Sequence, residues 1–322
     1  MTGPDGTPDA LKVGIAQIAP QWLDREQTLA KVVRYAEMAA EEDCRLVTFG
    51  EALVPGYPFW VGRTQGAQFN SLVQKDIHAH YMDQAVQIEA GHLESLQQIA
   101  AQHSLAMYVG CIERAPDRGG HSLYCSLVYI DGQGVIQSVH RKLMPTYEER
   151  LTWSPGDGHG LRVHRIGAFT AGGLNCWENW MPLPRTALYG MGEDLHVAVW
   201  PGSIRNTHDI TRFIGKEARS YVMSASALMR KADISGMIPH WDLVAGNVPD
   251  LLADGGSCIS GPEGEWVVEP IVGEETLILA TLDHQRVRAE RQNFDPAGHY
   301  ARPDVARLTV NRERQSTLAI VD

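Results

Sequence analysis

The chain has 322 residues, of which 44% are hydrophobic and 21% are charged, a balance typical of a soluble globular protein with a large core. Its net charge of −11, with no basic run to offset it, argues against a nucleic-acid partner, which would require a basic face. The sequence contains no stretch of about 18 consecutive apolar residues, so no membrane span and no membrane partner are expected.

The first ten residues and the cysteines indicate the cellular compartment of the protein. Residues 1–10 are rich in Gly, Pro, Thr and Asp and lack the apolar core of a signal peptide, so a disordered lead-in is expected. The cysteines are odd in number, widely spaced and free of any Cys-x-x-Cys pair. They are Cys44, Cys111, Cys125, Cys176 and Cys258. This pattern is typical of free thiols in a reducing compartment and predicts a cytoplasmic protein.

A strand–helix–strand unit opens the regular structure. Residues 11–18 form an apolar run typical of a buried strand. Asp24, followed three residues later by Gln27, resembles a capping box and predicts the start of a helix with an apolar stripe. A second strand is expected at residues 45–49. Because a crossover helix connects parallel neighbours, the two strands are expected to be parallel.

Helices and strands continue to alternate along the rest of the chain. Hairpins are indicated at the turn sequences DGQG (131–134) and GPEG (261–264). Further strands are expected at residues 105–112, 123–130, 135–141, 161–166, 196–200, 257–260, 265–268 and 277–282. Further helices are expected at residues 93–102, 181–188 and 209–223, the last with Tyr221 and Val222 on its apolar side, and after residue 282. Hairpins mixed with crossover units, with no linker between them, predict one α/β domain with two packed sheets covered by helices.

Three segments place a reactive side chain where a predicted strand ends. Glu51 follows a strand in FGEALVPGYPFW, and Lys142 ends another in HRKLMPTYEER. Cys176 ends the small, apolar run AGGLNC. Because the carboxyl ends of strands in open α/β sheets collect the reacting groups, these three side chains are expected to meet at one edge of the sheets.

Each of these residues also has a plainer interpretation. Taken singly, Glu51 is a solvated loop carboxylate, Lys142 an exposed basic strand end, and Cys176 a small buried hydrophobe. Against this, a thiol between a strand and a helix lies near the positive end of the helix, which lowers its pKa and favours the reactive thiolate. Taken together in their three contexts, the residues favour catalysis.

The segments GEALVPGYPFW, HRKLMPTYEERLTW and GGLNCWENWMPL resemble, in this order, the Glu, Lys and Cys signatures of the nitrilase (carbon-nitrogen hydrolase) superfamily. The similarity runs from residue 11 to about residue 307 and includes the closing NFDPAGHYARPD. Within the superfamily, Cys-Trp-Glu-Asn is typical of the true nitrilase branch. The resemblance implies an α/β fold of the four-layer α-β-β-α sandwich type. It places one hydrolase domain at residues 11–307, between the lead-in (1–10) and a short tail (308–322).

The resemblance also implies a chemistry without cofactor or metal. Cys176 is expected to attack the carbon of an organic nitrile, giving a thioimidate, then a thioester, and finally the carboxylic acid and ammonia. Glu51 is expected to act as the general base. Lys142, with the backbone N–H of Trp177, is expected to stabilise the negative charge on the nitrogen.

Further residues are assigned by the same comparison and by their proximity to the motifs. Glu149 matches the family's fourth polar position, since the pattern Pro-Thr-x-x-Glu-Arg selects it over Glu148, and it is expected to keep Lys142 charged and oriented. Glu178 is a candidate helix cap. Four aromatic residues are either core or wall of the substrate pocket, and as wall they favour aryl-bearing nitriles. They are Tyr57, Trp60, Trp177 and Trp200.

Several alternatives remain open at this level. His78 and His80 lack a third ligand at suitable spacing, so a zinc site is rejected. The same Glu-Lys-Cys set would also serve an amidase, a carbamoylase or a cyanide-hydrolysing enzyme. A catalytically silent scaffold for assembly or binding is the alternative of a different class. Because family members pair through helices near the active site, a homodimer or higher homo-oligomer is expected.

Overall fold

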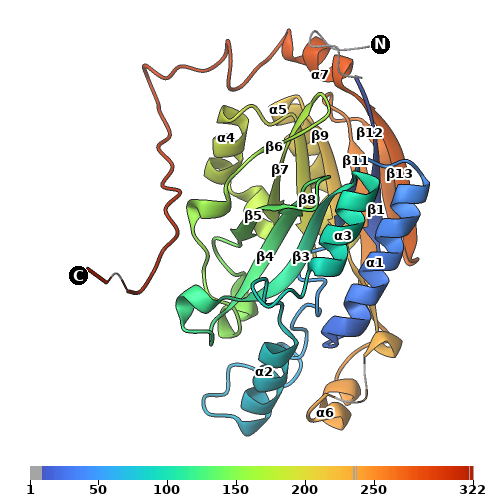
Figure 1. Ribbon diagram of the computed structural model, residues 1–322, viewed down its shortest axis with the longest axis vertical. Coiled ribbons are helices and arrows are strands. Elements are labelled where there is room, and N and C mark those ends of the chain that lie inside the picture. Colours follow the sequence, from blue (N-terminus) through green and yellow to red (C-terminus); the bar gives the residue numbers. More distant parts are fainter. Residues whose placement is uncertain (1–8, 235, 237, 319, 322) are drawn as a thin grey trace.

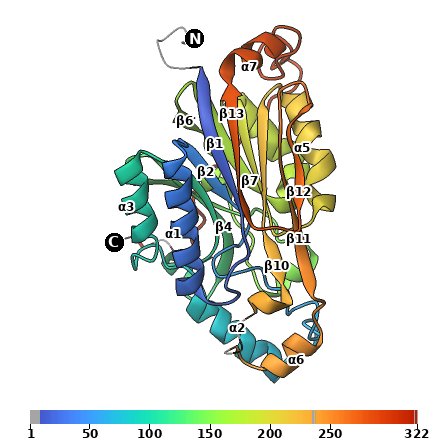
Figure 2. The ribbon, with the colours of Figure 1, turned by 90° about the vertical axis from the view of Figure 1, so that its right-hand side faces the viewer.

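Two β-sheets packed face to face form the centre of the protein (Figures 1 and 2). On one side they are covered by α1 (Arg25–Glu41) and α3 (Glu94–His103), and on the other by α5 (Ile204–Ala218), as Figure 2 shows. Each of these helices buries an apolar stripe against a sheet, which is the arrangement that hides the most apolar surface from water. The predicted four-layer α-β-β-α sandwich is confirmed.

The computed structural model describes residues 9–234, 236, 238–318 and 320–321. Residues 1–8 of the predicted lead-in lie outside this part of the chain. The prediction is wrong for its last two residues, because Asp9 is buried and pairs with Arg288 at 2.7 Å and Ala10 begins a strand. Of the helices that are described, none combines the length and the apolar character needed to cross a membrane.

The first sheet has six strands in the order β13-β1-β2-β3-β4-β5. The β1–β2 pair is parallel, as predicted, β2–β3 is also parallel, and the other pairs are antiparallel. α1 joins β1 to β2, and the carboxylate of its cap, Asp24, accepts a hydrogen bond from the N–H of Gln27. The strands are β1 (Ala10–Gln17), β2 (Leu46–Phe49), β3 (Ala106–Arg114), β4 (Leu123–Ile130), β5 (Ile136–Arg141) and β13 (Thr276–Asp283).

The second sheet follows the path β10-β11-β9-β8-β7-β6, with β12 paired to β11. β7, β8 and β9 are parallel, and β11 and β12 form the second predicted hairpin. The strands are β6 (His164–Ile166), β7 (Phe169–Asn175), β8 (Leu195–Trp200), β9 (Tyr221–Ser226), β10 (Leu228–Arg230), β11 (Leu251–Ser260) and β12 (Trp266–Val272).

The helix predicted at residues 209–223 is displaced toward the N-terminus. α5 ends at Ala218, because Arg219 takes a left-handed conformation with a φ of 51° and its N–H bonds to the carbonyl of Gly215. Tyr221 and Val222, which periodicity assigns to the helix, lie in β9. A short apolar run fits the face of a helix or a buried strand equally well, and here the turn at Arg219 decides between them.

Some of the remaining helices are expected from the sequence and others are not. α4 (Pro182–Gly190) and α7 (His284–Arg291) lie where helices are expected. The sequence pattern does not indicate α2 (Leu72–Gln84) or α6 (Trp241–Gly246). α2 buries only Ile77 and Tyr81 along its length, so its sequence shows no continuous apolar stripe.

The central core lies between the sheets, where both inner faces present apolar side chains. Tyr108 and Leu127 from the first sheet meet the second sheet at Gly173. A Cβ at Gly173 would lie 2.9 Å from Cδ2 of Leu127, so glycine allows the sheets to approach. Other members of this core are Val13, Ile15, Leu46, Ala106, Val197, Val199, Met223 and Ala225.

The loop after β2 is held between the two sheets. The backbone N–H of Glu51 donates to the carbonyl of Trp200 at the end of β8, which belongs to the second sheet. On the side of the first sheet, the loop crosses Gly110 of β3. A Cβ at Gly110 would lie 2.8 Å from Cα of Glu51 and still closer to the carbonyl oxygen of Gly50. Glycine is therefore required for Glu51 to take its place.

We predict that Gly110→Ala destabilises the protein by about 2 kcal/mol, because the added methyl group meets backbone atoms that have little room to move. Chemical unfolding at neutral pH measures this change. Gly190→Ala is the matched control, since a Cβ at that helical position has no neighbour within 4 Å. Equal unfolding free energies for the two variants would contradict the close approach.

Candidate active site

Four of the predicted site residues meet in one buried cluster. Nζ of Lys142 lies 2.9 Å from Oε1 of Glu51 and 2.7 Å from Oε2 of Glu149. The sulfur of Cys176 and one oxygen of each carboxylate lie within 4.8 Å of one another. All four side chains are at most 3% exposed. We call these residues the buried tetrad.

Lys142 continues β5 by one residue beyond its last strand position. Its backbone N–H donates to the carbonyl of Cys125 at 2.7 Å, and its own carbonyl accepts from Gly156 at 2.7 Å. The backbone is thus fixed on both sides, and the side chain reaches inward to the two carboxylates. Its ammonium group supplies the positive charge between Glu51 and Glu149.

Glu149 lies on the short helix η2 (Tyr147–Leu151) and is oriented by three donors. One oxygen accepts from Lys142 and from the backbone N–H of Thr146 at 2.6 Å. The other accepts from the hydroxyl of Tyr57 at 2.8 Å. Glu149, and not its neighbour Glu148, is therefore the carboxylate that holds Lys142, as the sequence pattern predicts.

Cys176 occupies a strained turn between β7 and the short helix η4 (Cys176–Trp180). Its φ is 48°, a conformation that residues other than glycine seldom adopt. The side-chain amide of Asn179 donates to the carbonyl of Cys176 at 2.8 Å and helps to hold the turn. Such strain persists where the surroundings fix it, and it is common at reactive residues.

The charges in the tetrad determine the protonation of its members. Burial raises the pKa of Glu51 to about 7, with Lys142 opposing the shift and Glu149 adding to it. Burial also raises the pKa of Cys176, and the Glu51 carboxylate raises it further. For Lys142 burial acts in the opposite sense, but the surrounding anionic groups, Glu51 foremost, outweigh it and raise the pKa. Lys142 is therefore charged, and Cys176 is a thiol.

The predicted lowering of the Cys176 pKa is thus wrong. The N–H of Trp177 does act in that direction, but complete burial and the neighbouring carboxylates are stronger. In addition, α4 begins only at Pro182, beyond η4, so the positive end of a long helix is not beside the sulfur. The thiol needs a base to remove its proton, and Glu51, which has an oxygen within 4.8 Å of the sulfur and a pKa of about 7, suits that role.

Three observations point to the same family. They are the fold, the buried Glu, Lys and Cys side chains, and a match to a known sequence family. The carbon-nitrogen hydrolase family matches residues 12–292. The chain belongs to the carbon-nitrogen hydrolase family. The resemblance expected from the three motifs is confirmed.

Two relatives and one solved structure illustrate how this hydrolase compares. A protein named nitrilase 2 from an unknown prokaryotic organism is 35% identical over 96% of the chain and 95% of its own length. An aliphatic nitrilase from Rhodococcus rhodochrous is 30% identical over 97% of the chain and 82% of its length. The crystal structure of a carbon-nitrogen hydrolase from Helicobacter pylori G27 has the same fold, with a TM-score of 0.64 and 17% identity over 92% of this chain and 96% of that one.

The four aromatic residues predicted for the pocket lie in different surroundings. Tyr57 is beside the tetrad, since its hydroxyl bonds Glu149. Trp60 packs in a buried cluster, with its ring 4.8 Å from that of Tyr81. Trp200 is fully buried in the cluster that contains Cys176. Trp177 is 50% exposed. The structure thus places Tyr57 at the site, and the pocket roles of Trp60, Trp177 and Trp200 stay predictions.

A small pocket opens beside Glu51, and most of its wall is missed by sequence reasoning. Its lining comes from the loops that follow β1, β2, β8 and β9 and from the short strand β10, and it is mainly apolar. The lining residues are Pro20, Glu51, Leu53, Tyr57, Phe59, Pro201, Ala227, Leu228 and Met229. Apart from Leu228 and Met229 in β10, these residues follow strand ends, and that position, which also indicates Glu51 and Lys142, could have identified them from the sequence.

Glu178 joins the segment that carries Cys176 to the segment that carries Lys142. One oxygen accepts from the N–H of Asn175 at 2.9 Å, which confirms it as a cap, and the other accepts from the N–H of Leu143 at 2.6 Å. Nε2 of His140 lies 3.0 Å away. Burial alone would raise the pKa of Glu178, but His140 and the two backbone donors outweigh it and lower the pKa. The sequence indicates the cap but not this link between the sheets.

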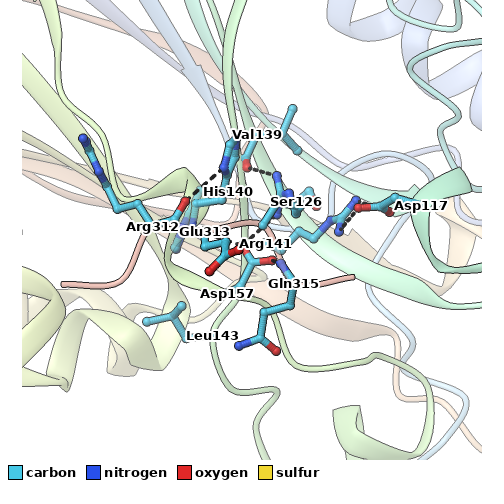
Figure 3. A network of polar contacts seen from close by, with 12 residues as sticks. Asp117, Ser126, Val139, His140, Arg141, Leu143, Asp157, Arg312, Glu313 and Gln315 are labelled. Atoms are coloured by element: carbon cyan, nitrogen blue, oxygen red, sulfur yellow. Dashed lines mark hydrogen bonds and ion pairs between the residues drawn. The ribbon is translucent and has the colours of Figure 1, made fainter. Parts of the chain in front are cut away.

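Behind Lys142, a second polar network ties down the end of β5 (Figure 3). Arg141 is buried and pairs with Glu113 and with Asp117, at 2.8 Å and 2.9 Å. The chain's extended C-terminal segment approaches from the other side, where Arg314 bonds Asp157 at 2.9 Å and the carbonyl of Val139 at 3.1 Å.

We predict that Glu149→Gln lowers hydrolytic activity about 100-fold, because an amide no longer fixes the Lys142 ammonium by charge. Ammonia release from a panel of nitriles and amides measures the rate. Glu148→Gln is the matched control and is expected to stay within about twofold of the unaltered protein. Similar losses of activity in both variants would contradict the role of Glu149 in holding Lys142.

Proposed function

We propose that this protein is a nitrilase, which hydrolyses an organic nitrile to the carboxylic acid and ammonia through a covalent intermediate on Cys176. The observation that carries the proposal is the Lys142 ammonium held between two buried carboxylates, next to a buried thiol. The relatives named nitrilases, similar over almost the whole chain, support the nitrile as substrate.

In the first step Glu51 takes the proton of the Cys176 thiol, and the sulfur attacks the nitrile carbon. A carbon–sulfur bond forms while one π bond of the nitrile breaks, and its electron pair moves to the nitrogen. The charged Lys142 stabilises the negative nitrogen as it develops. The nitrogen then receives the proton held by Glu51, which leaves a neutral thioimidate and an ionised carboxylate.

In the second step water adds to the thioimidate carbon, and Glu51 takes one of its protons. The nitrogen receives both protons of this water, one of them from Glu51, the carbon–nitrogen bond breaks, and ammonia departs to leave a thioester. A second water then breaks the carbon–sulfur bond, which releases the carboxylic acid and restores the thiol. The sum is one nitrile and two waters giving one acid and one ammonia. A base with a pKa of about 7 can both accept and return protons near neutral pH.

The pocket beside Glu51 supports a substrate with an apolar substituent. Leu53, Phe59, Pro201 and Met229 offer no charge to a polar group, and the hydroxyl of Tyr57 is already engaged by Glu149. The pocket has a volume of only about 10 Å³, so its walls must move apart before an aryl or alkyl group can bury apolar surface there.

We also propose that the protein works as a homodimer or higher homo-oligomer. Large apolar side chains are exposed on η4, α4 and α5 and at the residue between η4 and α4, and these helices contact one another. They are Trp177, Trp180, Met181, Leu183 and Phe213. A second copy covering them would bury this apolar surface. Sedimentation at micromolar concentration is expected to show at least a dimer, and a purely monomeric protein would contradict this.

The location and the domain boundaries are part of the same proposal. All five cysteines are free and buried, which suits a reducing cytoplasm. Residues 11–307 are proposed as the hydrolase domain and residues 308–322 as its tail.

The proposal predicts ammonia release from apolar nitriles and loss of that activity by about 10⁴-fold or more in Cys176→Ala. Because Glu51 must be ionised to accept a proton, kcat/KM is expected to rise with pH through about 7 and to fall below it. A panel of aryl, arylalkyl and alkyl nitriles with their matched amides measures the preference. Activity on amides with none on nitriles would support an amidase instead.

A further inference from the structure

The two oxygens of the Glu51 carboxylate have different surroundings. Oε1 forms an ion pair with the ammonium of Lys142 at 2.9 Å. It also accepts a hydrogen bond from the thiol of Cys125, whose sulfur lies 3.5 Å away. Oε2 is buried and has no hydrogen-bond partner among the residues that the structure describes. A buried, unpaired carboxylate oxygen has its lone pairs available for an incoming proton.

Cys125 contacts both Glu51 and Lys142. It lies on β4, next to β3 and β5 in the first sheet, and its carbonyl accepts the backbone N–H of Lys142 at 2.7 Å. Its side chain is 1% exposed and reaches Glu51. Among the four cysteines other than Cys176, Cys125 alone has a described hydrogen bond to a member of the buried tetrad.

The geometry points to Cys125 as a positioning residue, whose S–H group holds Oε1 of Glu51 and leaves Oε2 as the oxygen that takes the proton of Cys176. This inference rests on the proposed function. A thiol is a weak and long-reaching donor. It can orient the carboxylate without strongly stabilising its ionised form, so Glu51 keeps the basicity that proton removal requires.

Other titratable groups also face Glu51, and they remain the same when Cys125 is replaced. They are Lys142 after β5, Glu149 on η2, Cys176 on η4, Tyr57 in the loop after β2 and Tyr81 on α2. The hydrogen bond from Cys125 lowers the pKa of Glu51, against the larger effect of burial. A change confined to Cys125 therefore reports on this one donor.

The test compares Cys125→Ala with Cys125→Ser in the full chain. Removing the donor in the alanine variant is expected to move the acid limb of kcat/KM to higher pH by about half a unit and to lower kcat about tenfold, with little change in KM. The serine variant restores a donor, so its acid limb is expected at or below that of the unaltered protein, and its kcat within about threefold. Cys258→Ala and Cys258→Ser are matched controls, since Cys258 is buried in the other sheet.

A second readout does not depend on turnover. The rate at which iodoacetamide alkylates Cys176, located by peptide mass, is measured against pH and is expected to shift in the same directions. If the unaltered protein hydrolyses no nitrile while the alkylation profiles still shift, the proposed function fails and the role of Cys125 stands. Profiles unchanged in both variants would overturn that role. A serine variant that behaves like alanine would also overturn it, because the effect would then come from packing.

Discussion

The burial of two carboxylates around one ammonium is the constraint on which the rest of the site depends. Charges removed from water are tolerated only when they are paired, and Lys142 can neutralise only one of Glu51 and Glu149. Burial raises the pKa of Glu51, Lys142 opposes this shift, and the charge of Glu149 adds to it. A buried carboxylate that shares its single cation with a second carboxylate therefore becomes a base near neutral pH.

This arrangement also explains why the two sheets must be locked together. Lys142 extends the first sheet and Cys176 extends the second, so any sliding between the sheets would change the distance between amine and sulfur. Glu178 resists such sliding, because its carboxylate bonds the backbone at Leu143 and at Asn175 at the same time. Glu51 adds a second link through its hydrogen bond to Trp200 and its contact with Gly110.

Much of the fold and the four members of the tetrad could be predicted, because strand ends, caps and motif order are local features. Features that depend on packing could not be predicted. The end of α5 is set by one left-handed residue, Arg219, and the pKa of Cys176 by groups distant in sequence. Glu178 is readable as a cap, but its bond to Leu143 is visible only once the two sheets are placed. Residues such as Met229 line the pocket from an element too short to give a periodic signal.

The docking of the C-terminal segment has a consequence for how the protein is made. Figure 1 shows this segment leaving α7 and running along the outside of the molecule as an extended arm. Arg314 and Gln315 then bond Asp157, beside the strand end from which Lys142 projects. Domains fold as the chain emerges during synthesis, N-terminal parts first. Both sheets can therefore assemble before this fastening exists, and the support behind the amine is completed only after Arg314 and Gln315 have left the ribosome.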